Sequence, residues 1–183
     1  NSLYGGTYNL LANTLPRFGI TTTFVDPDDP GEFAKAVQSN TRAFFAESLG
    51  NPKLDVVDLK AISEAAQQAK VPFIVDNTVA SPALLNPIEH GANIVIHSLT
   101  KYLTGNGTSL GGVIIDAGTF DWGNGNFPEF TEPNPSYHGL NYHEALGNIA
   151  FIAKVRIEGL RDLGSAPSPF NSFQTIQGIE TLD

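Results

Sequence analysis

Short apolar runs separated by helix-length segments constrain the fold of this chain more than any other feature. Residues 71–76 and 94–97 carry mostly apolar side chains at successive positions, which is typical of strands buried on both faces. An amphipathic helix is expected to begin at Asp58. Its apolar face consists of Leu59, Ile62, Ala65, Ala66 and Ala69. Strands joined through helices form right-handed crossovers, so the sequence predicts an α/β fold with a mainly parallel sheet and helices on both faces.

The other expected elements follow the same patterns. Helices are expected at residues 7–18, 32–37 and 142–163 and from Phe170 onward, and strands at 20–25, 42–47 and 110–116. The segment 120–142, rich in Gly, Pro, Asn and aromatic residues, is expected as a long ordered loop. Residues 1–164 are interpreted as one domain, and residues 165–183 as a link toward a C-terminal subdomain. Because the chain has no Met and begins with Asn1, we interpret it as an excerpt of a longer protein that lacks part of the N-terminal region.

Composition and charge exclude several classes of protein. Apolar residues make up 41% of the chain and charged residues 16%, which excludes a disordered protein. The net charge of −9 argues against nucleic acid or an anionic membrane surface as a partner. No apolar run approaches the roughly 18 residues of a membrane-spanning helix, and no export signal is recognised, which favours the cytoplasm. The chain has no Cys, and His90, His138 and His143 lack ligand spacing, so no metal site is expected.

Polar side chains follow two of the expected strands. Asp76 ends one strand, and Ser98, Thr100 and Lys101 follow another. Ligands of open α/β sheets bind beyond the carboxyl ends of the strands, so both sets can face one site. Pyridoxal phosphate (PLP) needs a Lys amine for its Schiff base, a carboxylate beside its pyridine nitrogen and hydroxyls at its phosphate. Taken alone, Asp76 is better explained as a turn cap and Lys101 as an exposed solubilising side chain. Together they favour PLP.

Four motifs carry a resemblance to a known family. They are Tyr-Gly-Gly-Thr at residues 4–7, Glu-Ser-Leu-Gly-Asn-Pro at 47–52, Asp-Asn-Thr at 76–78 and His-Ser-Leu-Thr-Lys-Tyr at 97–102. In this order they resemble the signature of the Cys/Met-metabolism PLP-dependent enzymes, the cystathionine γ-synthase-like branch of fold-type I. The resemblance covers nearly the whole chain. It implies the large domain of a fold-type I PLP-dependent transferase, with PLP as cofactor.

The resemblance also implies roles for individual residues. Lys101 is expected to hold PLP and to move protons, Asp76 to pair with the pyridinium nitrogen, and Tyr4 to stack on the ring. The expected partners of the phosphate and of the ring hydroxyl are Ser98, Thr100 and Asn51. Two simpler interpretations stay open: Tyr4 packs on the first turn of its own helix, and Asn51 is a turn former.

Within the family, residues 127–133, 137–140 and 156–164 resemble O-acetylhomoserine sulfhydrylases. The resemblance implies conversion of O-acetylhomoserine and sulfide, or another thiol, to homocysteine and acetate, by a homo-oligomer that is a dimer or a tetramer. Aromatic and Pro residues between residues 120 and 140 are expected to form a rigid wall that favours a small acceptor. On this interpretation, replacing Phe127 and Phe130 by Ala raises activity with larger thiols.

Two alternatives remain. A cystathionine γ-synthase or a methionine or cystathionine γ-lyase shares every residue of the expected site and differs only in the segment 120–140. The chain is also compatible with a structural fragment that is inactive when isolated, because no Arg suited to the substrate carboxylate is recognised. Arg156 and Arg161 lie on an expected helix and are interpreted as structural.

Overall fold

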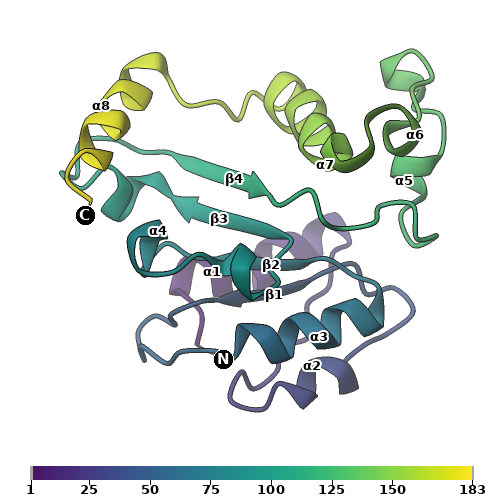
Figure 1. Cartoon of the computed structure of the whole chain (residues 1–183), viewed down its shortest axis with the longest axis horizontal. Coiled ribbons are helices and arrows are strands. Elements are labelled where there is room, and N and C mark those ends of the chain that lie inside the picture. Colours follow the sequence, from purple (N-terminus) through teal and green to yellow (C-terminus); the bar gives the residue numbers. More distant parts are fainter. Residues whose placement is uncertain (1, 183) are drawn as a thin grey trace. The chain divides into compact units, whose positions relative to one another are not determined.

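The computed structural model describes residues 2–182, which form two compact units. The first ends at Ala92 and the second begins at Asn93. Each unit contains one pair of strands with helical segments around it, and each is treated by itself below (Figure 1).

The first unit carries the parallel strands. They are β1 (Phe44–Glu47) and β2 (Phe73–Asp76), paired in register from Phe44 with Phe73 to Glu47 with Asp76. The helical elements are α1 (Gly5–Asn9), η1 (Leu10–Thr14), η2 (Leu15–Phe18), α2 (Gly31–Lys35), α3 (Leu59–Ala69), α4 (Ser81–Leu84) and η3 (Pro87–His90). Since α3 lies between β1 and β2 in the chain, this is the strand–helix–strand unit that the sequence predicts.

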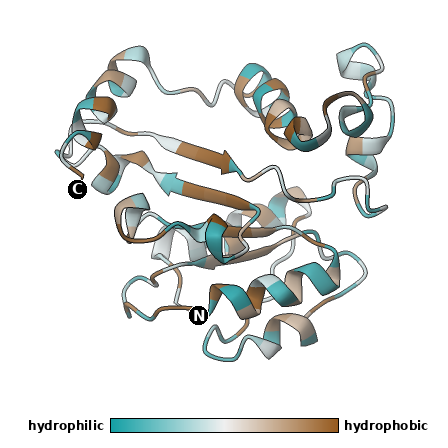
Figure 2. Ribbon diagram, in the orientation of Figure 1, coloured by the Kyte–Doolittle hydropathy of each residue, from teal (hydrophilic) through white to brown (hydrophobic). Residues whose placement is uncertain are grey.

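Helix α3 begins and buries its face as its sequence dictates. The side chain of Asp58 caps the helix by accepting a hydrogen bond from the N–H of Ala61 at 3.0 Å. Ile62 and Ala66 on its apolar face are almost fully buried, and α3 contacts β2, α2 and η3. Figure 2 shows this division as brown and teal stripes along α3. The predicted helix is confirmed.

The predicted strand at residues 20–25 is wrong. Within the described part of the chain these residues form no strand. The ring of Phe24 instead packs against the ring of Tyr8, with 5.0 Å between centroids. The β-branched residues thus lie in a segment without regular secondary structure, which contacts α1 through the side chain of Phe24. The expected helix at 7–18 is helical throughout, in α1, η1 and η2, and ends where Gly19 adopts a positive φ of 79°.

The second unit carries an antiparallel pair, β3 (Ile94–Ser98) and β4 (Gly112–Asp116). The helical elements are η4 (Leu99–Leu103), α5 (Pro128–Thr131), η5 (Pro135–Tyr137), α6 (Tyr142–Leu146), η6 (Gly147–Ile149), α7 (Ala150–Lys154), η7 (Val155–Asp162) and α8 (Pro169–Ile179). The connection between β3 and β4 contains no α-helix that could carry a crossover, so β4 returns beside β3 in the opposite direction. Figure 1 shows the two opposed arrows.

Helices in this unit are shorter than the sequence predicts. The single helix expected at 142–163 is interrupted at Gly147, whose φ of 53° and ψ of −122° lie outside the helical region. The expected loop at 120–142 is partly helical, since α5 and η5 lie within it. Among the described residues, no helix combines the length and the apolarity needed to cross a membrane.

Candidate functional site

Carboxylates end both strands of the first unit. Glu47 and Asp76 are register partners at the last position of β1 and β2, and the N–H of Ser48 donates to the carbonyl of Asp76 at 2.9 Å. Parallel strands present their carboxyl ends at one edge, so the two side chains occupy the same edge of this pair. The expected strand-end position of Asp76 is confirmed.

Asp76 is held by one of its two oxygens. Its Oδ1 accepts hydrogen bonds from the backbone N–H of Thr78 at 2.9 Å and from Thr78 Oγ1 at 2.5 Å. Its Oδ2 forms no hydrogen bond within residues 2–182. Two donors on Oδ1 fix the plane of the carboxylate, which leaves Oδ2 as an acceptor for an outside group.

A buried amide fixes the loop that follows. Asn77 has no exposed surface, accepts a hydrogen bond from Ser48 Oγ at 2.7 Å, and donates to the carbonyls of Ser81 and Leu85. The end of β1, the end of β2 and the turn around α4 are therefore joined through one side chain. This network explains why the carboxylate of Asp76 sits in a fixed position.

The carboxyl of Glu47 forms hydrogen bonds with the backbone of two other candidate residues of this unit. Its Oε1 accepts the backbone N–H of Tyr4 at 2.7 Å, and its carboxyl also accepts the backbone N–H of Asn51. Ser2 Oγ donates to Asp55 nearby, so two carboxylates hold the N-terminal segment against the loop after β1. Glu47 is not among the residues that the sequence predicts at the site. Its signal was its position: a buried acidic residue ends a strand directly beside Asp76.

The ring of Tyr4 is half exposed, at 50%. One edge lies over Gly6, where an added Cβ would approach Tyr4 Cε1 to 2.6 Å. The interpretation that Tyr4 packs on its own first turn is thus correct in part. The remaining exposed surface leaves ring area for a planar ligand.

Burial raises the pKa of the Glu47 carboxyl, because only 6% of the residue is exposed and the charged form is poorly solvated. The N–H groups of Tyr4 and Asn51 act in the opposite direction by stabilising the charged form. The negative charges of Asp76 and Asp55 raise the pKa further.

Glu47→Gln is therefore expected to change the pH dependence of stability. A carboxyl whose pKa is raised on folding contributes stability that is present below its unfolded pKa of about 4.3 and is lost as the pH rises through its folded pKa. The unfolding free energy of the wild type, relative to the Gln variant, should fall over that window. Urea unfolding of the full-length protein at a series of pH values measures this difference. The control is Glu64→Gln on the exposed face of α3, and equal pH dependence in both variants would refute the assignment.

The other candidate residues share one turn of the second unit. Ser98 ends β3, and Thr100 and Lys101 lie in η4 directly after it. Lys101 departs from helical geometry, with φ −97° and ψ −124°, and its carbonyl accepts the N–H of Gly105 at 2.9 Å. The structure thus confirms that Lys101 follows a strand end, within a turn closed by its own backbone.

The hydroxyl of Thr100 is tied to the start of β4. It accepts the N–H of Gly111 at 3.2 Å and donates to the carbonyl of Gly111 at 3.3 Å, while Leu99 N–H donates to the same carbonyl at 2.9 Å. These bonds close the loop between the Lys101 turn and β4. To donate a hydrogen bond to a phosphate, the Thr100 hydroxyl has to rotate and give up its 3.3 Å hydrogen bond to the carbonyl of Gly111.

Three aromatic side chains of the expected wall are buried. Trp122, Phe127 and Phe130 are each at most 5% exposed. Trp122 stacks on Phe130 at 4.4 Å and on Phe151 of α7 at 5.0 Å. We call Phe120, Trp122, Phe127, Phe130, Tyr142 and Phe151 the aromatic cluster. Its rings pack on one another through stacked and edge-to-face contacts. The expectation that replacing Phe127 and Phe130 by Ala raises activity with larger thiols stays a prediction.

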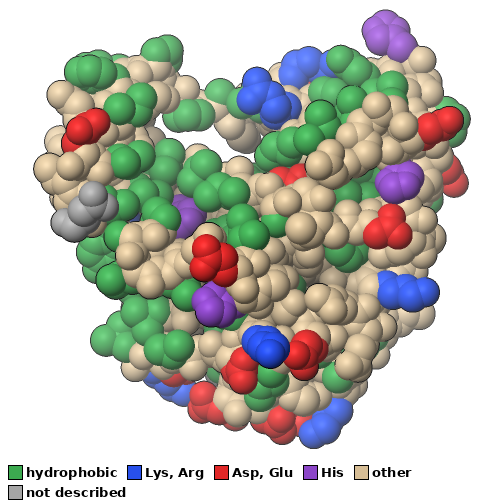
Figure 3. Space-filling view, viewed as in Figure 1, with side chains coloured by type: hydrophobic (Ala, Val, Ile, Leu, Met, Phe, Trp, Pro, Cys, Tyr) green, Lys and Arg blue, Asp and Glu red, His purple; other side chains and the backbone are tan. Residues whose placement is uncertain are grey.

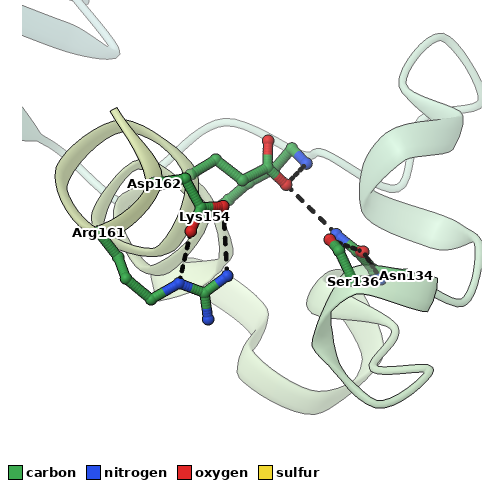
Figure 4. A network of polar contacts seen from close by, with 6 residues as sticks. Asn134, Ser136, Lys154, Arg161 and Asp162 are labelled. Carbon is green, nitrogen blue, oxygen red and sulfur yellow. Dashed lines mark hydrogen bonds and ion pairs between the residues drawn. The ribbon is translucent and has the colours of Figure 1, made fainter. Parts of the chain in front are cut away.

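A polar network lies next to this cluster, and Figure 4 shows its side chains. Lys154 pairs with Glu158, and Glu158 accepts a hydrogen bond from Asn134 Nδ2 at 3.2 Å. Lys154 Nζ also lies 5.2 Å from the centre of the Tyr142 ring. Arg161 pairs with Asp162, as Figure 4 shows. These contacts join the loop around η5 to η7. Among residues 2–182, no group of three or more His, Asp or Glu is placed to hold a metal ion.

The sequence of this chain is similar to the sequences of known enzymes. A model of the Cys/Met metabolism PLP-dependent enzymes matches residues 1–183. The whole chain is 59% identical to an O-acetyl-L-homoserine sulfhydrylase of Leptospira meyeri, of which it covers 43%. Over 98% of its length it is 51% identical to a homocysteine synthase of Schizosaccharomyces pombe, of which it also covers 43%. The chain therefore spans under half the length of these curated relatives.

Two solved structures share the fold. A protein of Campylobacter jejuni described as an O-acetylhomoserine (thiol)-lyase, with pyridoxyl-lysine monophosphate in its crystal structure, aligns with a TM-score of 0.95 at 42% identity. An O-acetylhomoserine sulfhydrylase of Wolinella succinogenes aligns with a TM-score of 0.83 at 36% identity. The alignments cover 100% of this chain and 45% and 49% of those proteins. The predicted α/β class is confirmed.

Proposed function

This chain belongs to the Cys/Met-metabolism PLP-dependent enzyme family, and we propose that the full-length protein is an O-acetylhomoserine sulfhydrylase. It converts O-acetylhomoserine and sulfide to homocysteine and acetate. The observation that carries the proposal is 59% identity, over the whole chain, to an O-acetyl-L-homoserine sulfhydrylase. The chain covers 43% of that relative, so the activity is proposed for the intact protein.

The residues present fit PLP as the cofactor. Asp76 offers an oriented carboxylate whose Oδ2 has no hydrogen bond within residues 2–182, which suits a protonated ring nitrogen. Tyr4 offers a half-exposed ring for stacking. Lys101, Ser98 and Thr100 offer an amine and two hydroxyls on one turn. When bound, PLP supplies an electron sink for the carbanion chemistry of amino acids.

In this proposal the candidate side chains would divide the tasks of the site. Lys101 Nζ would hold PLP and move protons of the substrate, and Asp76 would pair with the protonated ring nitrogen. Tyr4 would hold the ring by stacking and would act in catalysis at the reacting atoms. Ser98 and Thr100 donate to the phosphate, with the Thr100 proton turning from the carbonyl of Gly111. Asn51 approaches the ring hydroxyl.

The wider assignments rest on the family resemblance. Residues 1–164 belong to the large PLP-binding domain, and residues 165–183 lead toward a further subdomain. The protein acts in the cytoplasm as a homo-oligomer, a dimer or a tetramer. The high identity to a sulfhydrylase and a homocysteine synthase supports sulfide as the acceptor.

We expect the full-length protein to form homocysteine from O-acetylhomoserine and sulfide faster than it uses methanethiol, and far faster than it uses cysteine. Additional carbon and polar atoms on the acceptor must be accommodated next to the reacting carbon, and a site fitted to sulfide discriminates against them. The measurement is kcat/KM for the three acceptors side by side. Cysteine as the preferred acceptor would identify a γ-synthase, and cleavage of methionine or cystathionine without an acceptor would identify a γ-lyase.

A further inference from the structure

Helix α8 lies against the turn that carries Lys101. Its N-terminal half holds the loop before β4, since Asn171 Nδ2 donates to the carbonyl of Leu110 at 3.0 Å and Gln174 accepts the hydroxyl proton of Ser109. Its C-terminal half contacts η4. The loop between the Lys101 turn and β4 is thus held along the length of one helix.

A buried pair of hydroxyls marks the contact with η4. Thr104 is 1% and Thr175 7% exposed, and their Oγ1 atoms lie 2.9 Å apart. Thr175 donates its own proton to the carbonyl of Asn171 at 3.0 Å, so in this pair Thr104 donates and Thr175 accepts. The hydrogen bond therefore has one direction and one geometry.

Next to this pair, the absence of a side chain at Gly178 lets the backbone of α8 contact the backbone of Leu103 and Thr104. A Cβ added to Gly178 would lie 2.5 Å from the carbonyl carbon of Thr104, closer still to its oxygen, and 2.7 Å from the carbonyl oxygen of Leu103. Both neighbours are backbone atoms and cannot rotate away as a side chain would. Gly178 is buried, and only a residue without Cβ fits there without a shift of the turn.

The affected peptide group is the one that bonds to Lys101. The carbonyl of Thr104 and the N–H of Gly105 belong to one rigid plane, and that N–H donates to the carbonyl of Lys101 at 2.9 Å. Any displacement of the Thr104 carbonyl moves the donor that closes the Lys101 turn. Gly178 thus packs against the Thr104–Gly105 peptide group, and that peptide group is hydrogen-bonded to the backbone of Lys101.

We propose that Gly178 is a positioning residue for Lys101: its missing side chain lets α8 press on the Thr104–Gly105 peptide and fix the turn that presents the amine. The consequence for catalysis rests on the proposed function. The opposite face of α8 is not involved, because Phe170, Phe173 and Ile176 are exposed there, and apolar side chains gather at the surface over this helix in Figure 3.

Gly178→Ala in the full-length protein tests the proposal. Gly159→Ala is the matched control, because Gly159 is also helical and its added Cβ would meet only Val155 Cγ1 at an ordinary 3.8 Å. Ala is a better helix former than Gly, so propensity alone favours both variants. We expect kcat to fall by about a hundredfold in Gly178→Ala, as for a misplacement of about 1 Å, with a much smaller change in KM. The control should stay within about twofold.

Two readouts separate positioning from a merely structural role. Deuterium exchange of the amides at residues 99–105, measured in protein prepared without PLP, should be faster in Gly178→Ala only. The pH midpoint of the visible absorbance of bound PLP should shift in Gly178→Ala and not in Gly159→Ala. Equal exchange and an equal midpoint in both variants would overturn the proposal, even if Gly178→Ala were less stable.

Thr175→Val keeps the test decisive if Gly178→Ala does not fold. Val preserves the shape of Thr and removes the acceptor of the Thr104 proton, so it loosens the same contact less severely. Faster exchange at residues 99–105 supports the proposal, and unchanged exchange contradicts it. The exchange experiment needs no cofactor. If the protein proved not to be a sulfhydrylase, the exchange measurement would therefore still test the role of Gly178.

Discussion

Lys101→Ala is expected to abolish turnover of the full-length protein and the covalent attachment of PLP. Lys101 follows β3 directly and lies in a turn that the bonds of Gly105 and Thr100 close. On the proposed function, loss of its amine would remove both the group that binds PLP and the group that moves protons. Proton transfer alone is worth about 10²–10⁴ in rate, so the combined loss should reach at least about 10⁴.

Borohydride reduction of the wild type followed by peptide mapping is the direct measurement. The pyridoxyl group should be found on the peptide that contains Lys101 and should be missing from the variant. Lys60→Ala is the control, because Lys60 is exposed on α3 and its replacement should leave attachment and rate unchanged. A pyridoxyl group on another lysine of the wild type would refute the assignment.

Phe130→Ala is expected to destabilise the protein by about 3–5 kcal/mol. The ring is 4% exposed, stacks on Trp122 at 4.4 Å and lies 6.5 Å from the ring of Tyr142. Its removal leaves a cavity in the aromatic cluster and takes away a face over which Lys154 lies at 5.7 Å. The unfolding free energy from urea denaturation of the full-length protein measures the loss.

Phe170→Ala is the matched control. The same ring is removed from an exposed position on α8, where the expected change is within about 0.5 kcal/mol. If Phe130→Ala kept wild-type stability and accepted larger thiols, the ring would form a wall of the acceptor site as the sequence suggested. Loss of stability with an unchanged order of acceptors would establish it as a core residue.

Sequence reasoning located the strand-end residues because their signals are local. Asp76 and Ser98 end short apolar runs, and both are the last residues of their strands. The helix that begins at Asp58 was likewise predictable, because one capping side chain and one apolar stripe define it. The residue types at the strand ends favour PLP but are not specific for it. The four motifs are specific, so the prediction of the cofactor depends mainly on them.

The rest depends on contacts between residues far apart in the sequence. The hydrogen bond from Tyr4 to Glu47 and the approach of Gly178 to Thr104 leave no local pattern. The ring of Phe24 packs on Tyr8, which β-propensity does not foresee. The sequence predicts the rings of Phe127 and Phe130 as part of a wall, and only the structure shows that both are buried among other rings.

The aromatic cluster also bears on how such a protein can diverge. The segment from Phe120 to Phe151 packs its aromatic rings on one another, so its apolar interior is built from its own residues. Surface turns of such a segment tolerate substitution better than its core. Gly125 and Gly139 are exceptions, because their positive φ strains any residue that has a Cβ, although the space beside them is open. Proteins of this family are therefore expected to differ more in these surface turns than in the buried rings.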